Sequence, residues 1–212
     1  MGTDEKWGQS PFPLERSWTK AWDALGLRPA AGLFETLVGH YQEAHRRYHT
    51  VLHLAECIER LEPALALAER PGEVEIALWF HDVIYNPRCK DNEQRSADRA
   101  GRALEQAGAR SDVVARVCSL VMATQHSAEP ATIDERLLVD VDLAILGAAP
   151  ARFAEYEAQV REEYGWVPRW LFRRQRQALL RGFLHRKHIY ATEHFRRLYE
   201  FAARQNLERA VA

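Results

Sequence analysis

The residues of this sequence best suited to chemistry are a histidine and an aspartate that lie next to each other in an apolar run. Four apolar residues precede His81, and two follow Asp82. We expect this pair to be largely buried, and burying a carboxylate is costly unless a partner compensates its charge. A metal ion is one such partner, because imidazole and carboxylate suit Zn, Fe, Ni and Mn, and carboxylates also suit Mg. A hydrogen-bonded pair that fixes helix packing is the other interpretation, and the dipeptide alone does not decide between them.

Three histidines upstream of this pair are spaced by four residues: His45, His49 and His53. On a helix, side chains at this spacing share one face. A histidine stripe of this kind is usually solvated, but here apolar residues follow it. The sequence predicts two antiparallel helices, 50–70 and 73–85, joined by a Pro-Gly turn. That arrangement would bring His49 near one end of the second helix.

Two further acids, Asp140 and Asp142, lie among eight aliphatic residues between 137 and 146. A single buried aspartate is more often a helix cap or an acceptor for backbone N–H groups, but two in one apolar run are harder to explain in that way. A His, a His-Asp pair and an Asp from three helices would suit an octahedral or five-coordinate metal ion. Water would complete the coordination.

The order and spacing of these residues resemble those of the HD-domain superfamily of metal-dependent phosphohydrolases. The similarity extends to four short segments: Arg47-Tyr-His-Thr-x-x-His53, Trp79-Phe-His-Asp-x-x-Tyr85, Asp91-Asn-Glu-x-Arg-Ser96 and Asp140-x-Asp142-Leu-Ala-Ile-Leu-Gly147. It covers about residues 30 to 195 and is closest to a bacterial subgroup described only as metal-dependent hydrolases of this superfamily. An isolated His-Asp dipeptide has no such specificity, whereas the ordered set on helices does.

The resemblance implies that His49, His81, Asp82 and one later acid bind a divalent metal ion. The last ligand of the superfamily usually follows a small residue and precedes a hydrophobic helix, which favours Asp142 over the alternative, Asp140. The sequence does not select the ion, and Mn, Mg, Fe, Co, Ni and Zn all stay open.

Two further histidines are candidates for the same centre. His53 would either support a ligand or bind a second ion. His126 occupies a place where two-metal members of the superfamily often carry additional histidines. The fuller set of such ligands is not evident in this chain, so a single ion is the favoured prediction.

The resemblance also implies a reaction, the hydrolysis of a phosphate ester by metal-activated water. A divalent ion lowers the pKa of its bound water and polarises a phosphoryl oxygen, so that hydroxide attacks phosphorus in line. Asp91 or Glu93 would orient this water or take its proton, although both would also suit helix capping and solvation. Arg95 would clamp the phosphate with its planar guanidinium, or else form a surface salt bridge.

We therefore expect an enzyme, a hydrolase whose partner is a small phosphorylated molecule, with a nucleotide as the favoured substrate. Two other functions stay open. One is a regulatory module that binds metal or nucleotide without turnover, and the other is an oxygenase with two irons, as in some HD proteins. A homodimer is also compatible with the sequence.

The elements that must position these residues are all predicted to be helices. Long β-branched runs of period two are missing, and no Asn-Gly or Asp-Gly hairpin signal is present. Several residues are expected to cap helices: Thr50, Asp91 with Gln94, and Thr132 with Glu135. We predict a single all-α domain over residues 13–212, a helical bundle of the HD type, after a flexible tail of residues 1–12.

Composition narrows the class of protein. The 212-residue chain is 47% hydrophobic with a formal net charge of −1, so nothing global attracts it to nucleic acid or an anionic membrane. No run approaches the apolar length of a membrane-spanning helix, and the polar N-terminus lacks the apolar core of a signal peptide. Three widely spaced cysteines, Cys57, Cys89 and Cys118, are expected to be reduced thiols. We therefore expect a cytoplasmic protein without a nucleic-acid or membrane partner.

One segment outside these motifs is a candidate border of the active site. Trp166 and Trp170 flank Pro168, and an arginine-rich stretch, residues 169–176, follows. The tryptophans would form a lid or wall of the site, or else pack on the core beside solvated arginines.

Overall fold

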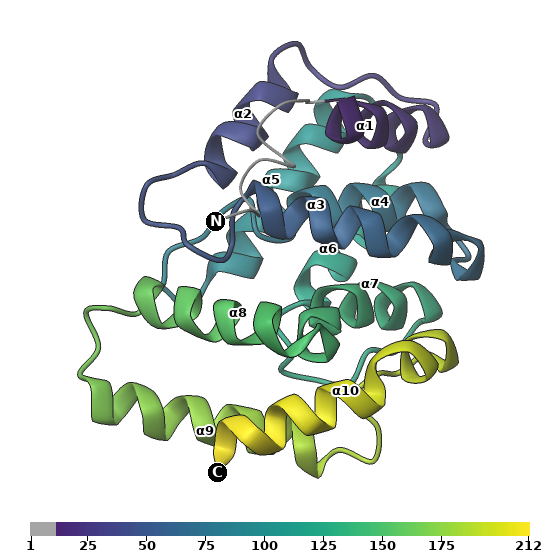
Figure 1. Ribbon diagram of the computed structural model, residues 1–212. Coiled ribbons are helices and arrows are strands. Elements are labelled where there is room, and N and C mark those ends of the chain that lie inside the picture. The colour runs from purple at the N-terminus through teal and green to yellow at the C-terminus, as the bar shows by residue number, and fades with distance from the viewer. Residues whose placement is uncertain (1–11) are drawn as a thin grey trace.

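In the computed structural model, which describes residues 12–212, the chain runs through ten α-helices and contains no strand. The helices are α1 (Phe12–Ala24), α2 (Leu33–Tyr41), α3 (Val51–Leu61), α4 (Pro71–Phe80), α5 (Asn92–Gln106), α6 (Ser111–Ala123), α7 (Ile133–Leu143), α8 (Pro150–Glu163), α9 (Arg169–His185) and α10 (Glu193–Val211). Two short 3-10 helices, η1 (Glu62–Leu67) and η2 (Ala144–Gly147), directly follow α3 and α7. Figure 1 shows the helices in approximate chain order, from α1 and α2 at one end of the molecule to α9 and α10 at the other. The all-α prediction is therefore confirmed.

Helix α4 lies in the core and contacts α1, α3, α5, α6 and α7. Every residue from 72 to 80 is buried, and a helix covered on nearly all sides is a core helix rather than a surface one. Trp79 and Phe80 have no exposed surface, and burying a side chain such as Phe80 contributes about 1.5–3 kcal/mol. This burial holds in place the end of α4 that carries His81 and Asp82.

The sequence predicted that this helix would continue to Tyr85, but α4 ends at Phe80. The N–H of Val83 donates to the carbonyl of Phe80 at 3.1 Å. This bond spans three residues instead of the four of an α-helix, so the chain tightens into a turn. His81 and Asp82 therefore lie in a turn and not on a continuous helix.

The start of α4 also differs from the prediction, in which Pro71-Gly72 ended the helix before it. Helix α3 ends earlier, at Leu61, and Pro71 is the first residue of α4. Proline is favoured at that position because its missing N–H would have no partner there. A Cβ on Gly72 would lie 2.9 Å from the Cβ of Ala24, so the absence of a side chain lets the end of α1 pack closely on α4.

The histidines at positions 45, 49 and 53 do not share a helical face as predicted. Helix α3 begins after its N-cap, Thr50, whose hydroxyl accepts a hydrogen bond from a backbone N–H of the first turn at 3.3 Å. The predicted cap is thus confirmed. Because the cap follows His49, only His53 belongs to the helix, and His45 and His49 lie in the loop before it.

The C-terminal helix α10 packs against η2 and holds the end of α7 in place. Gly147 is approached so closely that a Cβ there would lie 2.6 Å from the Cβ of Tyr199. The side-chain amide of Asn206 donates to two carbonyl groups on either side of this glycine, at 2.9 and 2.8 Å. Since η2 directly follows α7, these contacts fix the helix that carries the two downstream acids.

Of the two predicted capping boxes, the one formed by Thr132 and Glu135 at the start of α7 is confirmed. Asp91 is the N-cap of α5, but its side chain makes no capping hydrogen bond. Gln94 instead donates to Asp98 at 2.8 Å, so the second predicted box is wrong.

The predicted N-terminal tail falls almost entirely outside the described residues. Only its residue 12 lies within them, and this residue starts α1. Among the helices between residues 12 and 212, none combines the length and apolar character needed to cross a membrane.

Candidate metal centre

Four side chains that commonly bind metals converge between α3, α4 and α7. These residues, His53, His81, Asp82 and Asp142, are called the His/Asp cluster below. His53 lies on α3, His81 and Asp82 lie in the turn after α4, and Asp142 lies on α7. Nε2 of His81 is 3.1 Å from Oδ2 of Asp82 and 3.2 Å from Nε2 of His53. Nε2 of His53 is 3.3 Å from Oδ1 of Asp142.

The cluster has a buried side and an open side. Only 1% of each imidazole side chain is exposed, whereas Asp82 and Asp142 retain 19% and 16%. The histidines therefore belong to the core, and the carboxylates reach its boundary. Charged groups at this depth need compensation.

The hydrogen bonding of His81 leaves a lone pair at the centre of the cluster. Its Nδ1 donates to the carbonyl oxygen of Leu78 at 2.7 Å, so a neutral ring carries its hydrogen there and presents a bare Nε2. Nε2 of His53 lies 3.2 Å from this atom. The carboxylate oxygens of Asp82 and Asp142 lie 3.4 and 3.3 Å from the same His53 nitrogen. With so many acceptor atoms together, a hydrogen or a metal ion must lie among them, and the two carboxylates make the cluster favourable for positive charge.

The pKa values of the cluster also indicate that it favours positive charge. Burial alone would lower the pKa of His81, but the carboxylates of Asp82 and Asp142 outweigh it and raise this pKa to about 9. Burial would raise the pKa of Asp82, but the imidazoles of His81 and His49 hold it well below its usual range. Protons on the imidazoles thus balance the carboxylates, and a divalent cation would take their place, since metal binding releases protons from such ligands.

His49, a predicted ligand, lies beside the cluster and is held by a glutamate. It lines the same cavity as Asp82 and Asp142. Nδ1 of His49 lies 2.8 Å from Oε2 of Glu163, and its ring stacks on Tyr85 with 4.1 Å between ring centres. Burial would raise the pKa of Glu163, but the hydrogen bond from His49 outweighs it and lowers this pKa to about 2.

Arg46 joins the two segments that carry these predicted ligands. Its side chain is fully buried, and its guanidinium donates to the carbonyl oxygens of His49, Asp82 and Val83 at 2.9, 2.8 and 3.0 Å. These bonds fix the loop before α3 against the turn after α4. Nothing in the sequence distinguishes Arg46 from its half-exposed neighbour Arg47, so sequence analysis missed it.

His126, predicted as an additional ligand, contacts the cluster through Asp142. Nε2 of His126 lies 3.0 Å from Oδ2 of Asp142. Burial would raise the pKa of Asp142, but hydrogen bonds from His126 and His53 hold it well below its usual range. The backbone of His126 is left-handed, with φ of 56°, and its Nδ1 is buried without a hydrogen-bond partner among the described residues. Such a conformation costs about 1–3 kcal/mol and is characteristic of functional sites.

Asp140, the alternative last ligand, lies on a different side of α7. Its carboxylate accepts hydrogen bonds from the N–H groups of Ala191 and Thr192, both at 2.7 Å, and from the Thr192 hydroxyl at 2.6 Å. Residues two positions apart on a helix are rotated by about 200° around its axis, so their side chains point in nearly opposite directions. The structure therefore separates the two acids and brings only Asp142 into the cluster.

A cavity of about 720 Å³, called the main cavity below, opens onto the carboxylate side of the cluster. Basic and aromatic side chains contribute to its lining: Lys90, Arg176, Arg186, Tyr48, Tyr85, Tyr156, Tyr164 and Phe183. Its volume lies within the range of small-molecule sites, about 300–1,000 Å³. The combination of cations and rings suits an anionic ligand that also carries a planar group.

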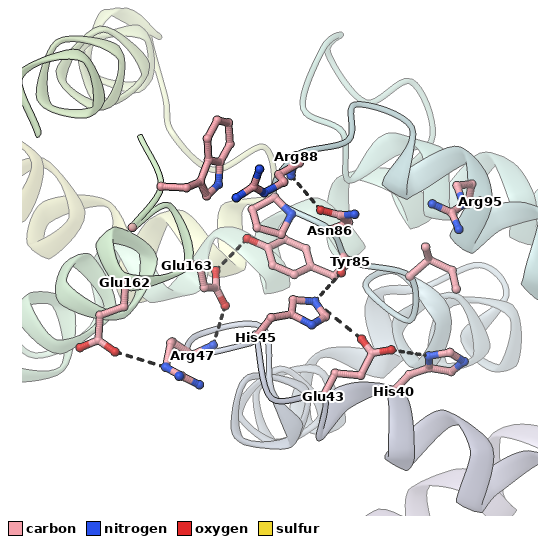
Figure 2. A pocket seen from close by; sticks show the side chains of 14 residues that line it. His40, Glu43, His45, Arg47, Tyr85, Asn86, Arg88, Arg95, Glu162 and Glu163 are labelled. Atoms are coloured by element: carbon pink, nitrogen blue, oxygen red, sulfur yellow. Dashed lines mark hydrogen bonds and ion pairs between the residues drawn. The ribbon is translucent and has the colours of Figure 1, made fainter. Parts of the chain in front are cut away.

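The three residues predicted to act on water or phosphate are separated in the structure. Glu93 lines the cavity of the cluster, where burial, supported by the nearby charge of Asp82, raises its pKa. Asp91 is exposed at the start of α5 and does not line this cavity. Arg95 lines a second cavity, which lies beside Tyr85 (Figure 2). Only Glu93 is placed to touch a ligand above the cluster.

Helix α9 forms one wall of the main cavity, but not through the two tryptophans considered for that role. Trp170 is 69% exposed, and Trp166 lines the second cavity, with the guanidinium of Arg88 at 4.8 Å from its ring centre. The wall is formed further along α9, where Leu179 and Gly182 face the main cavity. The lid interpretation therefore does not hold for the tryptophans at this cavity.

The donor set of the cluster fits a metal ion. The ligand atoms of His53, His81 and Asp82 all lie within 4.8 Å of one another, as do those of His53, Cys57 and Asp142. Imidazole and carboxylate are common ligands of divalent transition metals, and Cys57 would add a soft one. The cluster could therefore hold a metal ion. His53, for which the sequence left a supporting role open, belongs to both groups.

Comparison with protein-family models, curated proteins and solved structures found no match for this chain. Any functional assignment therefore depends on the chemistry of the cluster and its cavity.

Proposed function

We propose that the protein is a metal-dependent phosphohydrolase of the HD-domain type that acts on a small phosphate ester. The observation that carries this proposal is the His/Asp cluster, whose imidazole nitrogens lie 3.1–3.7 Å from its carboxylate oxygens at the boundary of the main cavity. A divalent cation held there would polarise a phosphoryl oxygen and acidify a water molecule. The proposed ligands are His49, His81, Asp82 and Asp142, with His53 close enough to join them.

Glu93 is the proposed general base of the reaction. It lines the cavity into which the carboxylates of the cluster also project. Burial raises the pKa of Glu93, whereas the pKa of Asp82 is depressed. The surroundings of the two acids therefore give them different pKa values. A carboxylate with a raised pKa accepts a proton more readily at neutral pH. Glu93 would therefore take the proton of the attacking water while Asp82 stays ionised.

The arginines of the cavity support a phosphorylated substrate. Arg176 is already bonded to Glu157 and to the hydroxyl of Tyr156, so its charge is largely balanced and it contributes a rigid part of the lining. Arg186 lies 4.7 Å from the ring centre of Phe183, which leaves the N–H groups at its edge for a phosphate. Aromatic rings in the lining of the same cavity suit a nucleobase, because base–aromatic stacking tolerates any base. A nucleotide is thus the proposed substrate class.

The test begins with protein purified without chelator, which should contain about one divalent ion per chain. Because the metal binds only the folded state, a free metal concentration of 100 times its Kd should add about 2.7 kcal/mol of stability. Hydrolysis is then assayed as phosphate release from a panel of nucleotides and sugar phosphates. A protein whose melting temperature ignores both chelator and added metal would contradict the proposal.

The same measurements separate the other functions considered. A metal-loaded protein that binds nucleotides but releases no phosphate from any of the panel would be a regulatory module. Two metal atoms per chain with visible absorption from iron would indicate an oxygenase.

A further inference from the structure

One buried carboxylate outside the cluster gathers more hydrogen bonds than any ligand candidate. Glu163, the last residue of α8, is 5% exposed. Its Oε1 accepts from the N–H groups of Arg47, Tyr48 and His49 at 2.8, 2.9 and 3.1 Å. Its Oε2 accepts from the Tyr85 hydroxyl at 2.7 Å and lies 2.8 Å from Nδ1 of His49. Figure 2 shows the carboxylate between Tyr85 and the backbone of Arg47.

These contacts define which nitrogen of His49 carries a hydrogen. Three backbone N–H groups are donors, so Oε1 must be an acceptor, and the phenol hydroxyl donates to Oε2. Four donors around the two oxygens favour the ionised carboxylate, which has no hydrogen to give to an imidazole. Nδ1 of His49 therefore donates, and the lone pair of a neutral ring lies on Nε2.

We propose that Glu163 is a positioning residue that holds His49 in the tautomer with hydrogen on Nδ1 and so keeps Nε2 free to bind metal. This inference rests on the proposed function for the metal, but the tautomer itself does not depend on it. Carboxylates that accept a hydrogen bond from a metal-binding histidine orient the ring and raise its basicity, and their loss typically weakens metal affinity about 10–100-fold.

The contact also explains how a residue in a loop is held in place. His49 precedes α3, and Glu163 reaches it across 114 positions of the chain. The three N–H groups that Glu163 binds are those of consecutive residues in this loop, which have no helical partners. One side chain of α8 therefore fixes both the backbone and the ring of His49.

The decisive variant is Glu163→Gln. Its amide oxygen can keep the place of Oε1 and the three backbone hydrogen bonds, which preserves the loop. Its NH₂ group then takes the place of Oε2 and faces Nδ1 of His49 as a donor. Nδ1 must now accept, so the ring hydrogen moves to Nε2 and blocks the lone pair that a metal needs.

Two matched variants control for the loss of charge and of the phenol bond. Glu162→Gln changes the preceding residue, whose carboxylate is 63% exposed and lies 3.4 Å from Nε of Arg47. Tyr85→Phe removes the other donor to Oε2 and leaves the bond to His49. Both should keep the wild-type tautomer and metal affinity.

The first readout is ¹⁵N NMR of the histidine rings in metal-free protein, with the His49 signals identified by their loss in His49→Ala. Wild type, Glu162→Gln and Tyr85→Phe should show hydrogen on Nδ1, and Glu163→Gln should show it on Nε2. A wild-type ring with hydrogen on Nε2 would overturn the proposal, and this outcome does not require Glu163→Gln to fold.

The second readout is the Kd for Zn²⁺ or Mn²⁺, obtained by competition with a chromophoric chelator. We expect Glu163→Gln to weaken binding about 10–100-fold, with the two controls close to wild type. Equal affinity of Glu163→Gln and wild type would overturn the proposed role. If wild type bound neither ion while the NMR showed the expected tautomers, the proposed function would fail and the assignment of Glu163 to His49 would stand.

Discussion

Asp140 and Asp142 are separated by one residue of α7, yet their surroundings differ completely. Asp140 has no exposed surface and accepts hydrogen bonds from the segment before α10, at Ala191 and Thr192. Asp142 keeps 16% of its side chain exposed and faces imidazoles, with His126 at 3.0 Å. The first carboxylate joins two parts of the fold, and the second belongs to the candidate metal centre.

The comparison shows that the kind of partner decides what a buried carboxylate can do. Burial raises the pKa of Asp140 more than its hydrogen bonds from Thr192 lower it, whereas imidazoles hold the pKa of Asp142 well below its usual range. The backbone N–H and hydroxyl groups around Asp140 keep their hydrogens, so a metal ion cannot replace these partners. Imidazole protons can be replaced by a metal ion, so Asp142 responds to one.

The largest effect should come from Asp142→Asn, which keeps the size of the side chain and removes its charge. Metal affinity should collapse and kcat/KM should fall roughly 10³-fold, equivalent to about 4 kcal/mol. In chelator the variant should be less stable than wild type, because the imidazoles of His53 and His126 lose the carboxylate that pairs with them. Elemental analysis, phosphate release and urea unfolding in chelator check the three statements. Full metal occupancy in the variant would contradict the assignment of Asp142 as a metal ligand.

The next effect should come from Asp140→Ala and should be one of stability. Truncation leaves three donors of residues 191 and 192, two of them buried, without their acceptor, at a cost of about 3 kcal/mol in the free energy of unfolding. For a chain of this size each kcal/mol lowers Tm by about 2–4 °C. Chemical denaturation at a temperature where the variant is folded measures this cost. Metal content per folded chain should stay that of wild type, and its loss would place Asp140 in the metal centre after all.

Glu93→Gln tests the proposed base, which lines the same cavity. Loss of a general base should lower kcat about 10²-fold, with metal content unchanged because Glu93 is not a proposed ligand. The matched control is Asp91→Asn, whose side chain is exposed and outside the cavity. Steady-state kinetics with metal analysis distinguish the two. Equal kcat values for both variants would remove Glu93 from the mechanism.

The smallest effect concerns two positions of α9 that differ, as the two aspartates do, in the face they occupy. An added Cβ at Gly182 meets no atom within 4 Å, and the residue lines the main cavity. Gly182→Leu should therefore fill the cavity and raise KM roughly tenfold, about 1.4 kcal/mol of lost binding. Trp170→Ala, at a residue 69% exposed, should leave KM unchanged. A raised KM for Trp170→Ala would restore the tryptophan as a wall of the site.

Local pattern was sufficient for the class of fold and for part of the site. The apolar run around His81 and Asp82 predicted their burial, because residues that are apolar on all sides of a helix need a core around them. The capping box of Thr132 and Glu135 was also predictable, since both partners lie within one turn. Features of this kind depend on neighbours a few positions apart.

Helix ends and loop positions were predicted less well. The sequence extended α4 to Tyr85, but the tertiary partner Arg46 binds the carbonyls of Asp82 and Val83 in the turn that follows Phe80. Similarly, the spacing of His49 and His53 suggested a shared helical face, which the cap between them excludes. A helix end is decided by which group satisfies its last carbonyls, and that group often comes from elsewhere in the chain.

The sequence by itself determined that this protein is all-helical and that it buries histidines and aspartates in apolar segments. The sequence favoured Asp142 over Asp140, but only the tertiary structure decided that Asp140 binds residues 191 and 192 instead, that His53 lies among the ligands, and that Glu163 holds His49. The physical reason is that a helix presents neighbouring residues to different partners, and packing between distant helices selects which partner each one meets. Spacing along the chain identifies the candidate residues. The way in which α7 and α8 pack on the core decides which of their side chains reach the cluster and His49.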